Sequence, residues 1–393
     1  MEESTDWYDE VTKELDDLVH KGQVYAQNPV NFIHADCWCG SNKKYKDCHY
    51  KQIDMAPMTK EDCRLIFKKY RRKSYSCLFN GCSEKSIKSH SIPSSWLSSI
   101  IDSDNFVYNF PLNLFNSSPE EPFEVEKLGV FESSTFKGFC LEHDSKLFEK
   151  IEKEGGWELT DENCLLLYYR SVCYELFAKC RAMSILEEVR GDISMGKDPV
   201  SQVCIFEVLC GRILGMKKAV EDLSVLKDKI EQYIKEKDFS VVSYTYIPIE
   251  SPINIMASGI HHPEQTFEGR DLQNLAEDNL MNMSCIVGQN GEEEFVLFIS
   301  IDENDERAAR FHKDLLTCDN LGNRIVIYLL ETTENLFWRI SDWDHLTNTQ
   351  KDKVYSILGG SVNSDILEYS KEDFITGIES FATKDSKIQQ KIV

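Results

Sequence analysis

The sequence has little positive charge. It contains 44 Lys and Arg residues against 67 Asp and Glu residues, so its net charge is −23. Such an acidic chain is not expected to bind nucleic acid over its whole surface. The basic residues are nevertheless concentrated, because residues 37–90 hold 13 of them and only 5 acidic residues, a local charge of +8 that leaves −31 for the remainder. This basic segment indicates either a localised phosphate-binding face or a solvated helix surface.

Several familiar signatures are missing. No stretch approaches the roughly 18 apolar residues that a membrane span needs. The acidic N-terminus, MEESTDWYDE, is unlike a secretory signal or a transit peptide. The sequence lacks a Walker loop, a GxGxxG after a strand and a GxSxG motif, which argues against P-loop NTPases, dinucleotide-binding enzymes and serine hydrolases. We therefore expect a cytoplasmic protein of another class.

Cysteine is plentiful, with 14 residues. A secreted disulfide framework is expected in a much shorter chain, whereas tight clusters favour reduced thiols and metal sites. The cysteines outside the clusters lie in apolar helical patterns and are expected in the core: Cys164, Cys173, Cys180, Cys204 and Cys210.

Hydrophobic periodicity predicts an α+β, multidomain fold. Helices are expected over 5–30, 59–73 and most of 158–238. After residue 239 the apolar runs have strand length and composition: FSVVSYTYIPI, EEFVLFISI, NRIVIYLL and NLFWRIS. The predicted order is an N-terminal helix with a zinc knuckle (1–58), a second zinc module (59–156), a helical segment (157–238) and an α+β domain (239–393).

The first cysteine cluster has the spacing C-x-C-x8-C-H and comprises Cys37, Cys39, Cys48 and His49. Thiolates and imidazole are the ligands that tetrahedral zinc prefers. Gly40 and Ser41 permit a sharp reversal between the two ligand pairs. A segment too short to build a core can fold around such an ion.

This stretch resembles the SEC-C motif, a small zinc hook. The resemblance is carried by the four ligands and by the intervening residues Gly40, Ser41, Lys43, Lys44, Tyr45 and Lys46. It covers about sixteen residues. It implies a structural zinc site that contacts a partner protein or an anionic surface, without chemistry of its own.

The second cluster is split along the chain. Cys77 and Cys82 flank an Asn80-Gly81 turn, and Cys140 and His143 follow about sixty residues later at an expected helix start. A knuckle and a helix N-terminus that share one ion would form a treble-clef zinc module. The alternative is two unrelated pairs.

The segment IKSHSIPSSWL resembles the strand end of HNH nucleases. The resemblance implies that His90 is the general base and that Asp144 binds a catalytic Mg²⁺ or Mn²⁺. It leaves open whether Asn105, Asn109, Asn113 or Asn116 completes the site. The sequence departs from many such enzymes at Ser89, where they carry an acidic residue or a second histidine. His90 could also bind zinc or cap a strand.

Two further groups of residues are candidates for binding. The basic run before the second cluster would contact nucleic acid through Lys68, Lys69, Arg71, Arg72 and Lys73. The adjacent His261 and His262 are expected in a loop, because neighbouring side chains on a strand point to opposite faces and would not share an ion.

These patterns support three functional hypotheses. The first is an HNH-like, metal-dependent nuclease with about two structural zinc ions, acting in genome or phage defence. The alternative is a non-catalytic zinc adaptor for nucleic acid or a partner protein. A third is a sensor whose C-terminal domain holds a small ligand.

Overall fold

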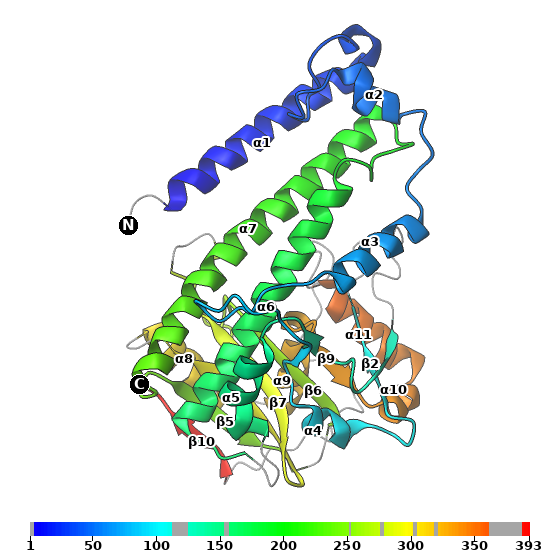
Figure 1. Cartoon of the computed structure of the whole chain (residues 1–393). Helices are drawn as coiled ribbons and strands as arrows, with labels where there is room; N and C mark the ends of the chain where they lie inside the picture. The colour runs from blue at the N-terminus through cyan, green and yellow to red at the C-terminus, as the bar shows by residue number, and fades with distance from the viewer. Residues whose placement is uncertain are drawn as a thin grey trace. The chain divides into compact units, whose positions relative to one another are not determined.

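The computed structural model describes residues 4–111, 125–152, 157–250, 253–275, 279–301, 305–317, 321–360 and 387–393 (Figure 1). With 51% helix and 16% strand, it confirms the α+β class. The chain divides into two compact units, one of residues 1–74 and 176–225 and the other of residues 75–175 and 226–393. Helices α6 (Asp161–Val189) and α7 (Pro199–Glu236) each contribute to both units.

The first unit is helical. Besides its parts of α6 and α7, it contains α1 (Ser4–Gln27), η1 (Pro29–Phe32), η2 (Tyr45–Asp47), α2 (His49–Gln52) and α3 (Lys60–Arg72). Helix α3 begins at Thr59, whose side chain and Asp62 form a reciprocal capping box. Helix α7 begins with Pro199, and Asp198 Oδ1 accepts hydrogen bonds from the amides of Val200 and Ser201.

A small apolar cluster joins the N-terminal segment to α7 within this unit. Trp38 and Tyr45 are buried and pack with Val203 and Phe206 of α7. Gly22 of α1 permits this contact, because a Cβ there would lie 2.9 Å from the Val203 side chain and 3.0 Å from the Trp38 ring. The segment around the first cysteine cluster therefore rests on a packed core.

The second unit is built on an antiparallel sheet. Among the described residues it has eight strands in the order β10-β5-β8-β7-β6-β9-β2-β3. The strands are β2 (Phe106–Asn109), β3 (Glu126–Gly129), β5 (Ser243–Pro248), β6 (Ile255–His261), β7 (Met283–Asn290), β8 (Glu293–Ser300), β9 (Leu336–Trp338) and β10 (Gln389–Lys391).

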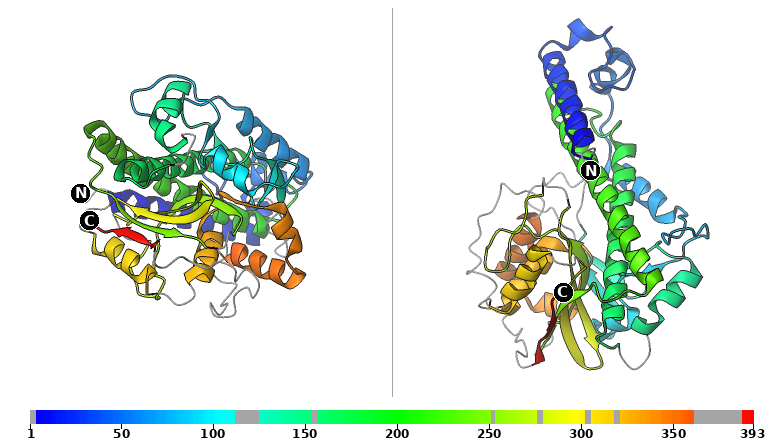
Figure 2. Two further views of the ribbon diagram at one scale, coloured as in Figure 1. Left: turned by 90° about the horizontal axis from the view of Figure 1, so that it is seen from below. Right: turned by 90° about the vertical axis from the view of Figure 1, so that its left-hand side faces the viewer.

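Both faces of this sheet are covered, so its central strands are apolar almost throughout. Every residue of β8 after Glu293 is buried. Helices α8 (Glu306–Leu315), α9 (Leu321–Thr332), α10 (Ile340–His345) and α11 (Asn348–Gly360) form one layer on the sheet (Figure 2). On the opposite face, Ser171 of α6 contacts Ser258 of β6, with 2.9 Å between the hydroxyl oxygens.

The second unit also has a separate two-stranded antiparallel sheet, the β1–β4 hairpin. Strand β1 (Ser89–His90) pairs with β4 (Thr135–Phe136), and α5 (Leu141–Glu152) follows. The chain between β1 and β4 includes α4 (Ser94–Leu97), η3 (Ser98–Ile100), β2 and β3. Because β2 pairs with β9, this long insertion is part of the main sheet.

Three expectations from the sequence are wrong. The run NRIVIYLL lies in helix α9, because a short, wholly apolar run has no period that separates a buried helix from a strand. Cys204 is exposed on α7 instead of lying in the core. His261 is the last residue of strand β6 and not part of a loop.

Helix α7 bears on the expectation that no segment spans a membrane. Among the described residues, it is long and apolar enough to cross one by length and composition alone. A buried helix of a soluble protein satisfies the same criteria, so the absence of a membrane span stays a prediction.

Candidate metal centres and functional site

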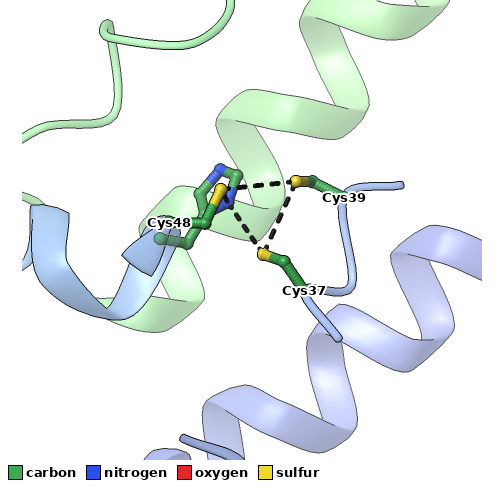
Figure 3. A group of neighbouring side chains, drawn as sticks. Cys37, Cys39 and Cys48 are labelled. Carbon is green, nitrogen blue, oxygen red and sulfur yellow. Dashed lines mark hydrogen bonds between the residues drawn. The ribbon is translucent and has the colours of Figure 1, made fainter. Parts of the chain in front are cut away.

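The first centre brings Cys37, Cys39, Cys48 and His49 together, with all four ligand atoms within 4.8 Å of one another. The Sγ atom of Cys39 lies 3.5 Å from that of Cys37 and 3.7 Å from that of Cys48 (Figure 3). The His49 Nδ1 atom lies 3.3 Å from the Cys37 sulfur and 3.4 Å from the Cys48 sulfur. The four ligand atoms therefore surround one common point.

Local backbone geometry creates this arrangement. Gly40 has φ +73° and allows the chain to reverse immediately after the first two ligands. The amide of Cys37 then donates to the carbonyl of Lys43 at 2.8 Å, and that of Tyr45 donates to the carbonyl of Ala35 at 2.9 Å. These bonds return the chain beside its starting point, so Cys48 and His49 meet the first pair.

Ring packing and a hydrogen bond hold the first centre in place. The His49 ring packs on Trp38, with 4.3 Å between the centroids. Gln202 of α7 donates through Nε2 to the His49 carbonyl at 3.0 Å. The centre is therefore attached to α7 by a hydrogen bond as well as by apolar contacts.

Close contacts between these ligands shift their pKa values in opposite directions. Hydrogen bonds from Cys37 and Cys48 lower the pKa of Cys39, and the same group of contacts raises the pKa of Cys37. Burial opposes protonation of His49, but hydrogen bonds to Cys39 and Cys48 outweigh it and raise its pKa to about 9. A bound cation would displace the protons from these groups, because cysteine and histidine bind metal in their deprotonated forms.

The second centre assembles Cys77, Cys82, Cys140 and His143, again with all ligand atoms within 4.8 Å of one another. The Cys82 and Cys140 sulfurs lie 3.9 Å apart. The His143 Nδ1 atom is 3.2 Å from the Cys140 sulfur and 3.6 Å from the Cys77 sulfur.

A turn and a helix start position these four ligands. The Cys77 amide donates to the Glu84 carbonyl at 2.9 Å, and Gly81, with φ +81°, closes the turn between the first two ligands. The Leu78 amide donates to the Gly138 carbonyl at 2.7 Å, which joins the turn to the segment before α5. The Phe79 ring stacks on His143 with a centroid separation of 4.3 Å.

A buried ionic network anchors the turn to the helices. Glu231 of α7 is 0% exposed and accepts hydrogen bonds from the Asn80 amide at 3.0 Å and from the Tyr169 hydroxyl at 2.8 Å. Lys227 donates to Glu231 and to the Asn80 side chain, both at 2.8 Å. This network stabilises the turn independently of any metal.

Both ligand sets fit zinc. Two ligands about 2.3 Å from a shared ion at the tetrahedral angle are about 3.8 Å apart. The sulfur–sulfur distances of 3.5–3.9 Å match that edge, and the sulfur–nitrogen distances of 3.2–3.6 Å suit the shorter Zn–N bond. The donor sets could therefore hold two structural zinc ions, with all four positions of each tetrahedron filled by protein.

His90 and Asp144 lie on elements adjoining the second centre. His90 ends strand β1, and Asp144 follows the ligand His143 in the first turn of α5. His90 Nε2 and Asp144 Oδ1 are both buried without a hydrogen-bond partner. Burial lowers the pKa of His90, so its imidazole is neutral at pH 7, and burial raises the pKa of Asp144 against the effects of Ser89 and Arg170.

The asparagine candidates are not equivalent. Asn109 donates through Nδ2 to the carbonyls of Glu334 and Leu336, so it is committed to the main sheet. Asn105 has φ +60° in the turn before β2. Asn113 and Asn116 lie outside the described residues.

The basic residues proposed for nucleic acid lie at the end of α3 and just after it. Lys69 forms an ion pair with Glu188 at 2.7 Å, so its charge is partly neutralised. Lys68 and Arg72 are exposed, as are Arg71 and Lys73. The structure therefore leaves a basic surface there, and its role in binding stays a prediction.

Sequence analysis assigned no role to Arg170 of α6 or to Glu152 of α5, which form an ion pair at 2.6 Å and whose charges affect the pKa values of His90 and Asp144. Arg170 is 0% exposed. The signal that would have identified it is a lone charge in the apolar run CLLLYYRSVCY, because an unneutralised arginine is not expected inside a helix core.

Comparison with known proteins agrees with the first centre. The SEC-C motif model matches residues 35–51, which contain all four of its ligands. Searches of curated proteins and of solved structures found no match. The motif covers a small part of the chain and describes the first centre alone.

Proposed function

We propose that this protein is a metal-dependent phosphodiesterase that cleaves nucleic acid with an HNH-like site beside the second zinc centre. The observation that carries the proposal is the position of two half-buried side chains beside the second zinc centre: His90 ends β1, and Asp144 directly follows the ligand His143. His90 Nε2 is buried without a hydrogen-bond partner, and in a working site the attacking water would supply one.

The order of elements supports this proposal. A cysteine turn, the β1–β4 hairpin and α5 follow one another, and the second centre clamps the turn to the start of α5. A treble-clef module of HNH type would have this order, with a base at the end of the first strand and a metal ligand beside the last zinc ligand. Here His90 and Asp144 occupy those two positions.

The donor set suits a hard divalent cation. A carboxylate oxygen is a preferred ligand for Mn²⁺ or Mg²⁺, which would polarise a phosphate and stabilise the leaving oxygen. Asp144 would hold the cation. His90, as a neutral base, would accept a proton from the attacking water through Nε2. The two zinc ions would hold the scaffold and take no part in the reaction.

Cleavage assays test this proposal. The wild-type protein would be incubated with plasmid DNA and with RNA in Mg²⁺ or Mn²⁺, beside His90→Ala and the matched control His20→Ala on the exposed face of α1. We expect cleavage by the wild type and the control, and a loss of at least 100-fold in His90→Ala. Absence of cleavage in every combination of metal and substrate would contradict a nuclease.

The alternative, a non-catalytic zinc adaptor for nucleic acid or a partner protein, has one observation in its favour. His90 Nε2 is closed to solvent, whereas a working base has to reach water. An adaptor would bind nucleic acid equally well with His90→Ala and would cut nothing, so the same assay, read by gel shift as well as by cleavage, distinguishes the two functions.

A further inference from the structure

The hairpin that carries His90 is too short to hold itself in place. Strand β1 pairs with β4 through two residues, Ser89 opposite Phe136 and His90 opposite Thr135. An isolated two-stranded hairpin is at best marginally stable in water. The position of the proposed base therefore depends on the contacts that the chain makes just before and just after β1.

The second centre holds the chain before His90. The Ile87 amide donates to the Phe139 carbonyl at 2.7 Å, and Phe139 directly precedes the ligand Cys140. The amide of Leu78, which follows the ligand Cys77, donates to Gly138 beside it. This end of the hairpin is thus joined to the turn and to the start of α5.

Two buried serines hold the chain after His90. The Ser91 amide donates to the Ser134 carbonyl at 2.8 Å, and the two serine hydroxyls are hydrogen-bonded to each other. The Ile92 amide donates to Ser134 Oγ at 2.9 Å. Ser134 has φ +57°, a left-handed conformation that a residue other than glycine keeps only where surrounding contacts enforce it.

Asn335 joins these serines to the main sheet. It lies directly before β9, and its carbonyl accepts from the Ser258 amide of β6 at 3.2 Å. Its side-chain Nδ2 donates to Ser91 Oγ at 2.8 Å and to the Ser258 carbonyl at 2.9 Å. Both hydrogens of the amide nitrogen are therefore used, one on the hairpin and one on the sheet. Asn335 and Ser91 are each 2% exposed, so water does not compete for these bonds.

We propose that Asn335 is a positioning residue, which fixes His90 for proton transfer by holding Ser91, the next residue in the chain. This inference rests on the proposed function, because it concerns how the base is held in place. A base has to lie within hydrogen-bond distance of the attacking water, and a displacement of about 1 Å can lower a rate about 100-fold. Asn335 contacts neither substrate nor metal in this role and acts through the hairpin.

Steady-state cleavage separates positioning from stability. Asn335→Ala removes the side-chain donor, and Ser91→Ala removes the hydroxyl that Asn335 holds. The control is Asn163→Ala, because Asn163 is also a buried asparagine that donates to a carbonyl, but its partner is Glu158 at the start of α6. We expect kcat to fall about 10-fold in the first two variants, with KM within about 2-fold of the wild type, and neither to change in the control. A purely structural asparagine would lower the free energy of unfolding and leave kcat of the folded protein unchanged.

The double variant tests whether Asn335 acts through Ser91. If the two side chains act as one unit, Asn335→Ala combined with Ser91→Ala should lose about as much kcat as the more damaging single substitution. A loss equal to the product of the two single losses would overturn the inference. Circular dichroism checks that each variant is folded. If Asn335→Ala does not fold, Ser91→Ala still tests the contact, because Asn335 then keeps its bond to Ser258.

Nuclear magnetic resonance provides a readout that does not depend on cleavage. Histidine labelled isotopically at Cε1 gives a resonance for each ring, and His90→Ala identifies the one from His90. We expect this resonance to shift in Asn335→Ala and in Ser91→Ala and to stay in place in Asn163→Ala. If the shifts appear but the wild type cuts nothing, the nuclease proposal alone fails. If the wild type cuts and Asn335→Ala changes neither this resonance nor kcat, the inference alone fails.

Discussion

The two candidate zinc centres have the same ligand set but are assembled in different ways. In the first, His49 is 12 residues from Cys37, and turns within one short segment bring the ligands together. In the second, His143 is 66 residues from Cys77, and two strands of the main sheet lie in the chain between them. The first is a local structure, whereas the second depends on the fold around it.

Support from the rest of the protein differs accordingly. The first centre is attached through an apolar cluster and the Gln202 hydrogen bond. The second is attached through the ionic network of Glu231, through backbone pairing and through the core beneath α5. We therefore expect the first centre to need its metal to fold and the second to keep much of its structure without metal.

Removal of metal is expected to have the largest effect on this difference between the two centres. Structural zinc contributes about 10–16 kcal/mol in small metal-folded modules, as much as the whole stability of a domain. After chelation, we expect residues 35–51 to lose their hydrogen-exchange protection and the β1–β4 hairpin and α5 to keep most of theirs. Elemental analysis should find about two zinc ions per chain beforehand. An equal loss of hydrogen-exchange protection at both centres would contradict the expectation that the first centre depends more on its metal.

Substitution of the two anchoring side chains is the next largest test. Glu231→Ala removes the buried carboxylate that pairs with Lys227 and accepts from Asn80 and Tyr169, and it leaves Lys227 with only the exposed Asp228 and the Asn80 side chain. We therefore expect a loss of about 3–5 kcal/mol in the free energy of unfolding. Gln202→Ala leaves only the His49 carbonyl unpaired and should cost about 1–3 kcal/mol. Urea denaturation measures both. A larger loss in Gln202→Ala would show that the first centre is the more dependent on its surroundings.

Acid should also affect the two centres, but a buried histidine outside them contributes to the pH dependence of stability and has to be separated first. His312 of α8 is 0% exposed between Thr245 and Ser300, and burial lowers its pKa from 6.5 to about 3. The unfolded chain therefore binds an extra proton between these pH values, and stability is lost as the pH falls below about 6.5. The slope should be at most about 1.4 kcal/mol per pH unit for this one group.

The variant His312→Gln isolates that contribution. We expect its stability to depend less steeply on pH between about 3 and 6.5 than that of the wild type. The acid sensitivity that remains includes His261, whose pKa is likewise lowered by burial to about 3, so the pH at which zinc is released is the measure of the two centres. An unchanged slope in His312→Gln would mean that the buried histidine does not contribute.

Surface ion pairs provide the smallest test. Lys44 pairs with Asp36 beside the first centre, and Lys146 pairs with Glu142 beside the second, all in exposed positions. Exposed pairs contribute little because water and salt screen them. We expect Asp36→Ala and Glu142→Ala to leave both the unfolding midpoint and the zinc content unchanged. A clear loss of zinc in either variant would show that the pair shapes its centre.

Much of the local structure could be predicted from the sequence. The capping residue Thr59, the Asp198-Pro199 helix start and the long apolar periods of α6 and α7 each act within a few residues, so their effect does not depend on distant contacts. The run that became α9 could not be assigned in this way. Its apolar residues are buried on several sides by the sheet and by α11, and that burial is a property of the packing.

The sequence by itself determined which eight cysteine and histidine side chains could form two zinc sites, because ligand chemistry and the short spacings of each pair are local properties. Only the tertiary structure decided that the insertion after β1 would join the main sheet and that Arg170 of α6 would pair with Glu152 of α5. Such contacts depend on the summed burial of segments far apart in the chain, and no short pattern of residues encodes that sum.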